Sequence, residues 1–211
     1  MHRPRILLAD DHALLLDAFS SLLETHYEII GLASDGREML SMASKLKPDV
    51  VVLDISMPNL NGFDAGEKLK KTRPEIKLIF LTVNEDPDMV AEAFRIGANG
   101  YLLKGSAGSE LFLAIDAVLT GSNYVTPIIA KGMINSFIKD PGGDKVHGSL
   151  SLRQREVLQL LAEGNTMKQV ASTLNITPRT VAFHKYQIMS DLEIKTNSEL
   201  IQYAVKLGIV S

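Results

Sequence analysis

Residues 50–58 read VVVLDISMP, and this stretch decides how the first half of the chain folds. The apolar residues at 50–53 run without polar alternation, which is typical of a strand buried on both faces of a sheet. Asp54 follows directly, and Pro58 with Gly62 indicates a turn that leaves the Asp54 carboxylate exposed beyond the strand. The stretch therefore predicts a parallel strand with a carboxylate at its carboxyl end.

Strand-like and helix-like segments alternate through the first 120 residues. Between the apolar runs, apolar residues recur at helical spacing, and Asp35-Gly36-Arg37-Glu38 reads as a capping box that opens the second helix. The order predicts an α/β fold of the (βα)5 type, with helices on both faces of an open parallel sheet. The expected strands are 5–9, 27–33, 50–53, 77–81 and 100–103.

Polar residues follow four of the expected strands directly. Asp10 and Asp11 end the first, Asp54 the third and Thr82 the fourth, and Lys104 ends the fifth. In an open parallel sheet, ligands bind outside the carboxyl ends of the strands, so these side chains are expected to share one crevice. Taken singly, an aspartate at a strand end is often a helix cap, a threonine a residue that favours strands, and a lysine a solvated side chain. Four strand ends with such residues together indicate a ligand-binding site.

Three carboxylates in one crevice repel each other unless a cation lies among them. Mg²⁺ needs few protein ligands because it keeps several waters, so Asp10, Asp11 and Asp54 suit it. A carboxylate held beside such a metal can attack phosphorus and become an aspartyl phosphate. Lys104 is expected to neutralise the phosphoryl oxygens, and Thr82 to donate a hydrogen bond to one of them.

Composition narrows the class of protein. The 211-residue length favours one or two domains, each able to bury a core. The absence of cysteine excludes a disulfide framework and a thiolate metal site, and we expect a reducing, cytoplasmic location. No apolar run approaches the roughly 18 residues of a membrane span, and Asp10-Asp11 come too early for a signal peptide. We expect a soluble protein without a membrane partner.

Charge and turn residues divide the chain. Residues 1–120 hold 12 Lys and Arg against 18 Asp and Glu, a net charge of −6, whereas residues 149–211 hold 7 against 5, a net charge of +2. Between them, 121–148 carries a possible short helix from Pro127 and then the turn-forming stretch 140–148. We predict a domain at 1–120, a linker at 121–148 and a mildly basic domain at 149–211.

The first 120 residues resemble a two-component receiver domain of the CheY-like fold. The resemblance is carried by the acidic pair, Thr82, Tyr101 and Lys104, and by Asp54 with Met57, Pro58 and Gly62. It implies that Asp54 is the phosphoacceptor, that a sensor histidine kinase is the partner, and that Asp11, Asp54 and the Ser56 carbonyl bind Mg²⁺ with Asp10 assisting. It also implies a switch that couples Thr82 to Tyr101. Val83 departs from the family, which commonly has a small residue there.

The last 63 residues read as four short helices. Ser151 to Gln154 forms a capping box for the first, and Gly164 ends it. Thr166 opens a second helix that stops at Asn175, and Thr177-Pro178 restarts a third that runs to about Leu192. The fourth begins at Thr196 to Glu199 and ends near Gly208. Two helices across a three-residue turn form a helix-turn-helix arrangement.

Helical geometry divides the third of these helices into two faces. Val181, Ile188 and Leu192 share one line and are expected in the core, whereas Phe183 and Tyr186 lie opposite. These aromatics either pack against a partner helix or the receiver, or insert into a major groove, where Phe183 touches thymine methyls and Tyr186 bonds an edge or phosphate. In the second case Arg179 and Lys185 reach the backbone.

Residues 149–211 resemble the LuxR-type DNA-binding domain of NarL/FixJ response regulators. The match includes Leu152, Arg155, Glu156, Val157, Leu158, Gly164, Ala171, Thr180, Val181, His184, Ile188, Met189 and Leu192. It implies double-stranded DNA as a partner. The residues expected at the DNA are Thr166, Lys168, Arg179, Thr180, Ala182, Phe183, Lys185 and Tyr186.

The sequence therefore predicts a DNA-binding transcriptional regulator controlled by phosphorylation of Asp54, with no catalysis beyond its own phosphorylation and dephosphorylation. One short recognition helix offers few phosphate contacts, so a phosphorylation-favoured homodimer on two half-sites is expected. Two alternatives remain: a phosphorylation-independent DNA-binding protein, and a magnesium-dependent phosphatase with an aspartyl-phosphate intermediate. The second needs an acid-base carboxylate two residues after Asp54, where Ser56 stands.

Overall fold

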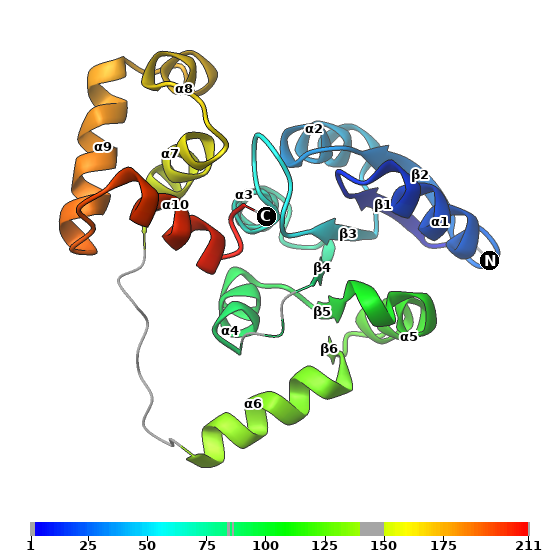
Figure 1. The fold of residues 1–211 in the computed structure, drawn as a ribbon. Coiled ribbons are helices and arrows are strands. Elements are labelled where there is room, and N and C mark those ends of the chain that lie inside the picture. The colour runs from blue at the N-terminus through cyan, green and yellow to red at the C-terminus, as the bar shows by residue number, and fades with distance from the viewer. Residues whose placement is uncertain (1–2, 84, 86, 140–149, 211) are drawn as a thin grey trace.

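The computed structural model describes residues 3–83, 85, 87–139 and 150–210, and two structural units are visible (Figure 1). The first unit is built on a parallel sheet with the strand order β2-β1-β3-β4-β5-β6. This order places β1, β3 and β4 at its centre, as the unbroken apolar runs predict. The strands are β1 Arg5–Ala9, β2 Glu28–Ala33, β3 Val50–Asp54, β4 Lys77–Thr82, β5 Gly100–Leu103 and β6 Tyr124–Val125.

Helices cover both faces of this sheet, which confirms the predicted α/β class (Figure 1). Alternate residues of β3 point to opposite faces: Val51 and Leu53 pack with α2, α3 and α4, whereas Val50 and Val52 pack with α1 and α5. The helices are α1 Ala13–Leu23, α2 Gly36–Leu46, α3 Gly62–Thr72, α4 Pro87–Ile96 and α5 Ala107–Leu119, with a short 3₁₀ turn η1 at Lys104–Ser106.

Two details differ from the sequence expectation. The strand β6 lies inside the segment predicted as linker, and it extends the sheet by pairing with β5. Two residues are too few to show a periodic pattern. Asp35 caps α2 as expected, but the Glu38 carboxylate accepts from the backbone N–H of Ser34 rather than from that of Asp35, so the capping box is incomplete.

The helix α6 Pro127–Lys139 follows β6 and confirms the short helix expected there. Its residue Ile129 packs into the core beside α4, which fixes the first half of the predicted linker to the sheet domain. The predicted break at 140–148 lies outside the described residues.

The second unit consists of four helices. These are α7 Leu152–Ala162, α8 Met167–Leu174, α9 Pro178–Asp191 and α10 Asn197–Lys206. Ser151 and Thr166 each form a complete capping box, and Thr177 caps α9, so the predicted helix starts are confirmed. Val181 and Ile188 of α9 are fully buried, as its apolar line predicted, whereas Leu192 lies at the end of the helix and is only partly buried. Among the described residues, no helix has the length and hydropathy needed to cross a bilayer.

Candidate functional site

The end of β3 positions Asp54. The strand is buried throughout, and Asp54 is its last residue, with 2% of its surface exposed, so the prediction of an exposed carboxylate is wrong. The chain then turns back sharply, so that the backbone N–H of Gly62 donates to the Ile55 carbonyl at 2.8 Å. An added Cβ on Gly62 would lie 2.1 Å from the Asp54 carbonyl oxygen, which explains the glycine there. The turn thus holds Asp54 at the carboxyl edge of the sheet.

Lys104 joins two of the predicted carboxylates. Its Nζ lies 2.7 Å from Asp10 Oδ2 and 2.9 Å from Asp54 Oδ2, and all three side chains are largely buried. Burial lowers the pKa of Lys104, but the contacts with Asp10 and Asp54 outweigh burial and raise it. The ammonium therefore stays charged between the ends of β1 and β3.

Burial also governs the acidity of the central carboxylate. Loss of water raises the pKa of Asp54 to about 6, and the negative charge of Asp10 adds to the rise. The contact with Lys104 and the backbone N–H of Ser56 oppose it. A carboxylate that is costly to ionise in isolation is stabilised when a further cation approaches.

The acidic residues form a cluster that fits a hard cation. One ligand atom from each of Asp10, Asp11, His12 and Asp54 lies within 4.8 Å of the others. Carboxylate oxygens are the donors that Mg²⁺ prefers, so the predicted residues suit it. His12 was missed from the sequence: its Nδ1 lies 2.7 Å from Asp11 Oδ1 and 3.1 Å from Asp10 Oδ1. Its position directly after the acidic pair was the available signal.

The remaining predicted receiver residues lie on β4, on β5 and in the turn after β3. Thr82 is the last residue of β4 and is 4% exposed, while Tyr101 of β5 is fully buried. Ser56 lies just beyond Asp54, and its Oγ donates to the carbonyl of Gly208 in the second unit at 3.2 Å. Val83 is 79% exposed and points to solvent, so it does not fill the crevice.

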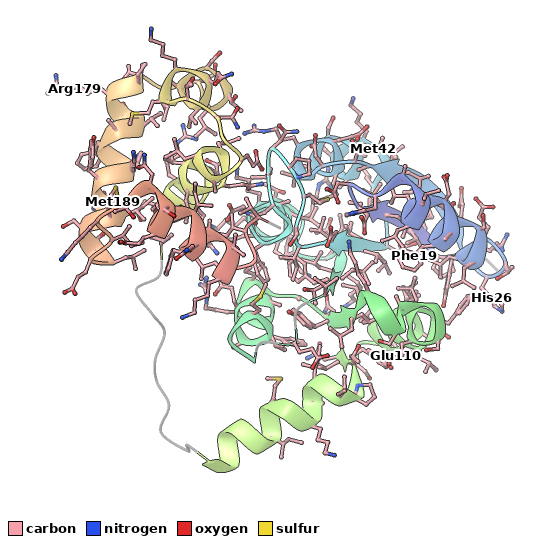
Figure 2. The ribbon with its side chains drawn as sticks, viewed as in Figure 1. Phe19, His26, Met42, Glu110, Arg179 and Met189 are labelled. Carbon is pink, nitrogen blue, oxygen red and sulfur yellow. The ribbon has the colours of Figure 1, made fainter. Side chains whose placement is uncertain are left out.

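Helix α9 presents the predicted aromatic face to solvent. Phe183 and Tyr186 are 62% and 60% exposed, which leaves the alternative of packing against another helix of this chain unsupported. Arg179, at the start of α9, extends away from the sheet domain (Figure 2). Lys185 differs, because it is only 8% exposed and lies on the side of Val181. A contact between Lys185 and DNA would require its side chain to leave this position.

The other residues predicted at the DNA lie near α9 or at the start of α8. Lys168 is exposed, and Thr166 donates from Oγ1 to Gln169 as part of its cap. Thr180 and Ala182 are half-buried in the first turns of α9. The two exposed aromatics therefore share α9 with Arg179, and Lys168 is exposed at the start of α8.

Sequence reasoning missed a third set of residues, which joins the two units. Arg155 and Gln159 of α7 contact the segment after β3 and the helices α3 and α4. A polar Gln159 between Leu158 and Leu160 was the signal for it, because all three prove to be buried. Sequence alone does not say what a buried glutamine faces.

Family models match both units of the chain. The response regulator receiver domain matches residues 6–116, and the bacterial regulatory proteins of the luxR family match residues 148–204. These matches cover the crevice around Asp54 and the helices α7 to α9.

Relatives match over nearly the whole length. The oxygen regulatory protein NreC of Staphylococcus haemolyticus is 35% identical over 210 residues, which cover 96% of this chain and 97% of the relative. NreC of Staphylococcus epidermidis is 35% identical over 211 residues, with the same coverage.

Solved structures agree with the sequence relatives. RcsB of Salmonella enterica serovar Typhimurium, bound to promoter rprA in the presence of phosphomimetic BeF3-, is 27% identical, covers 96% of this chain and 98% of its own, and superposes with a TM-score of 0.65. A LuxR-family regulator from Aurantimonas sp. SI85-9A1 is 28% identical over 64% of this chain and 99% of its own, with a TM-score of 0.62. The chain therefore belongs to the two-component response regulators of the NarL/FixJ type, which join a receiver domain to a LuxR-type DNA-binding domain.

Proposed function

We propose that Asp54 accepts a phosphoryl group from a sensor histidine kinase and that this modification controls DNA binding by residues 149–211. The observation that carries the proposal is Lys104, which lies between Asp10 and Asp54 at the ends of three strands. A carboxylate oxygen of Asp54 would form the new bond to phosphorus while the bond from phosphorus to the kinase histidine breaks. Lys104 then offers its charge to the phosphoryl oxygens, and Thr82 its hydroxyl.

We assign the metal ligands as Asp11, Asp54 and the Ser56 carbonyl, with Asp10 acting through water. Bound Mg²⁺ would neutralise the charge that gathers on the transferring group. Lys104 and the buried walls of the crevice position the Asp54 carboxylate for the donor. The reaction modifies and restores only the protein's own carboxylate, so we propose no other substrate.

The switch that follows is assigned to Thr82 and Tyr101. A phosphoryl group at Asp54 gives the Thr82 hydroxyl a new acceptor. Movement of β4 toward that acceptor would displace Tyr101 of the neighbouring strand β5. A modification at one end of the sheet needs such a two-state element to act at a distance.

For DNA, we propose that α9 enters the major groove of a double-stranded site. Its exposed aromatic face supports this role, since apolar side chains read thymine methyl groups and tyrosine can reach a base edge or phosphate. Arg179 and Lys168 would contact the backbone. Because DNA and sensor kinases are met in the cytoplasm, we place the protein there, and we keep 1–120, 121–148 and 149–211 as its domain and linker boundaries.

Phe183 and the basic residues are expected to differ in what their loss changes. Phe183→Ala should alter sequence preference by roughly 1–3 kcal/mol at one base pair, because it removes an apolar contact to a base. Arg179→Ala should weaken binding to all sequences and reduce the salt slope by about one unit. Lys185→Ala should do the same if its side chain swings out.

Salt titrations on a specific and a scrambled duplex measure both effects. Equal losses for Phe183→Ala and Arg179→Ala on both duplexes would show that Phe183 does not read bases.

The control of DNA binding by Asp54 is tested with beryllofluoride, which mimics the phosphoryl group. Full-length protein with Mg²⁺ should bind its specific duplex at least tenfold more tightly when beryllofluoride is present, because the modified receiver favours the binding-competent state. Asp54→Asn should remove this gain. Equal affinity with and without beryllofluoride would favour the phosphorylation-independent alternative.

A further inference from the structure

A small pocket lies within the DNA-binding domain. It is bounded by the end of α7, the segment that leads into α8, the middle of α9 and the start of α10, which are the four helices of this domain (Figure 1). Its volume is about 260 Å³, slightly below the roughly 300–1,000 Å³ of pockets that hold drug-sized ligands. The pocket therefore has room for a small ligand.

A buried lysine lines this pocket. Lys185 of α9 is 8% exposed, and among the described residues around the pocket it is the one that carries a charge. Lysine is rarely buried without a partner charge. No carboxylate in the described part of the chain forms an ion pair with Lys185. Its Nζ lies 5.6 Å from the centre of the Tyr186 ring, a contact that offsets a buried charge only in part. An anion in the pocket would supply the missing partner.

Two helix N-termini reach the same pocket. Met167 is the first residue of α8 and Asn197 is the first residue of α10, and both line it. The first N–H groups of a helix have no acceptor within that helix, and the aligned peptide dipoles add partial positive charge there. The caps Thr166 and Thr196 accept from the third N–H of each helix, not from the first. Both helix ends therefore favour an anion in the pocket that Lys185 lines.

The carboxyl end of α7 also borders the pocket, at Leu161, and such helix ends carry partial negative charge. It is the other group that could compensate the lysine. The carbonyls of Leu160 and Leu161 already accept from the backbone N–H groups of Asn165 and Gly164. They do not depend on a hydrogen bond from Lys185, which leaves its ammonium for a ligand.

The other walls of the pocket are mainly apolar. Leu161, Leu200 and Ile201 line it, and Leu200 belongs to the buried core of the domain. A single lysine matches a carboxylate with one negative charge better than a phosphate ester, whose charge at neutral pH approaches −2. Apolar walls gain free energy by covering an aliphatic chain. The chemistry of the pocket therefore suits one carboxylate carried on a short apolar chain.

We propose that this pocket binds a small aliphatic monocarboxylate. The carboxylate oxygens accept from Lys185 Nζ and from the first N–H groups of α8 and α10, while the aliphatic chain packs against Leu200 and Ile201. A ligand in this position contacts the inner side of α9 and leaves Phe183 exposed. The site is separate from the receiver and does not depend on phosphorylation of Asp54.

Hexanoate, added to the full-length protein at constant ionic strength, tests the site. Two-dimensional NMR of the isotope-labelled chain follows the amide signals of Met167 and Asn197 and the methyl signals of Ile201. We expect these signals to shift and to saturate with a dissociation constant on the order of 1 mM, as for a ligand of this size. Hexanamide has the same chain without the charge and should bind about tenfold more weakly or worse.

Three variants separate the lysine from its surroundings. Lys185→Met removes the charge but keeps a long apolar side chain, and it should weaken hexanoate binding by about tenfold or more. Asn197→Asp places a carboxylate at the start of α10, where it should pair with Lys185 and weaken hexanoate by a similar factor. Lys195→Met is the matched control, because Lys195 is exposed close to Asn197 in the chain but does not line the pocket. It should leave the affinity for hexanoate unchanged.

The site is wrong if hexanoate shifts none of these signals, or if wild type and Lys185→Met bind it equally well. Asn197→Asp changes an exposed position, so it decides the question even if Lys185→Met disturbs the fold. Wild-type affinity for hexanoate in Asn197→Asp would then count against the site. Tighter binding of inorganic phosphate than of hexanoate would overturn the assignment of a carboxylate.

Discussion

The substitution Asp54→Asn is expected to abolish phosphoryl labelling of the protein completely. A small phosphodonor with Mg²⁺ should add one acid-labile phosphoryl group to the wild-type chain, since the carboxylate of Asp54 is the nucleophile and an amide of the same shape is not. Intact-mass measurement before and after acid treatment gives the result directly. Asp17→Asn is the control, because Asp17 is an exposed aspartate of α1 that is not part of the acidic cluster.

Lys104→Ala separates phosphorylation from its consequence. Asp54 keeps its place at the end of β3 without Lys104, so labelling should persist at a reduced rate. The cation that draws the phosphoryl oxygens toward β5 is then absent, and the gain in DNA affinity should be lost. Undiminished labelling of the Asp54→Asn protein would move the phosphoacceptor to another residue, and a full DNA response in Lys104→Ala would remove that lysine from the switch.

The second large effect is expected from the spacing of DNA half-sites. One recognition helix with the cations Arg179 and Lys168 makes few phosphate contacts, so specific affinity should require two chains on half-sites about one helical turn apart. Inserting about 5 base pairs places the half-sites on opposite faces of the duplex. The second domain then loses its raised effective concentration, and affinity should fall by roughly 10²- to 10⁴-fold.

Sedimentation of the protein, alone and with each duplex, measures how many chains associate. The wild-type protein should become dimeric with beryllofluoride and bind the correctly spaced duplex as two chains, whereas an insertion of a full turn of about 10 base pairs serves as the control for added length. Tight binding of one chain to a single half-site, indifferent to spacing and to beryllofluoride, would contradict the dimer and leave DNA binding itself intact.

The receiver was predictable because its signals are local. The run at 50–53 marks a doubly covered strand, and Asp54 follows it in the chain as in the structure. Parallel pairing then brings Asp10 and Lys104 to Asp54 without further information, since the ends of neighbouring strands meet at one edge. The capped starts of α7, α8 and α9 were predictable for the same reason, because a cap is set by four consecutive residues.

What the sequence concealed depends on contacts between distant segments. The two residues of β6 become a strand only because β5 offers an open edge. Lys185 is different, because it lies one turn after Val181 on the same side of α9, so helical spacing could have predicted its burial. Arg155 was noted only as part of the resemblance to LuxR-type domains, and that motif does not say which residues it contacts. Its three carboxylate partners lie on α3 and α4, 63 to 91 positions away in the chain.

The helix α6 limits how far the DNA-binding domain can lie from the sheet domain. A linker of 28 extended residues, 121–148, would reach about 90–100 Å, far more than the separation of adjacent half-sites. The strand β6 and the 13 residues of α6 use up most of that length, and α6 itself spans only about 20 Å. The ten residues 140–149 span at most about 33–36 Å. The DNA-binding domain therefore cannot begin further from the end of α6 than about the length of one turn of the double helix. Widely separated half-sites lie beyond that distance.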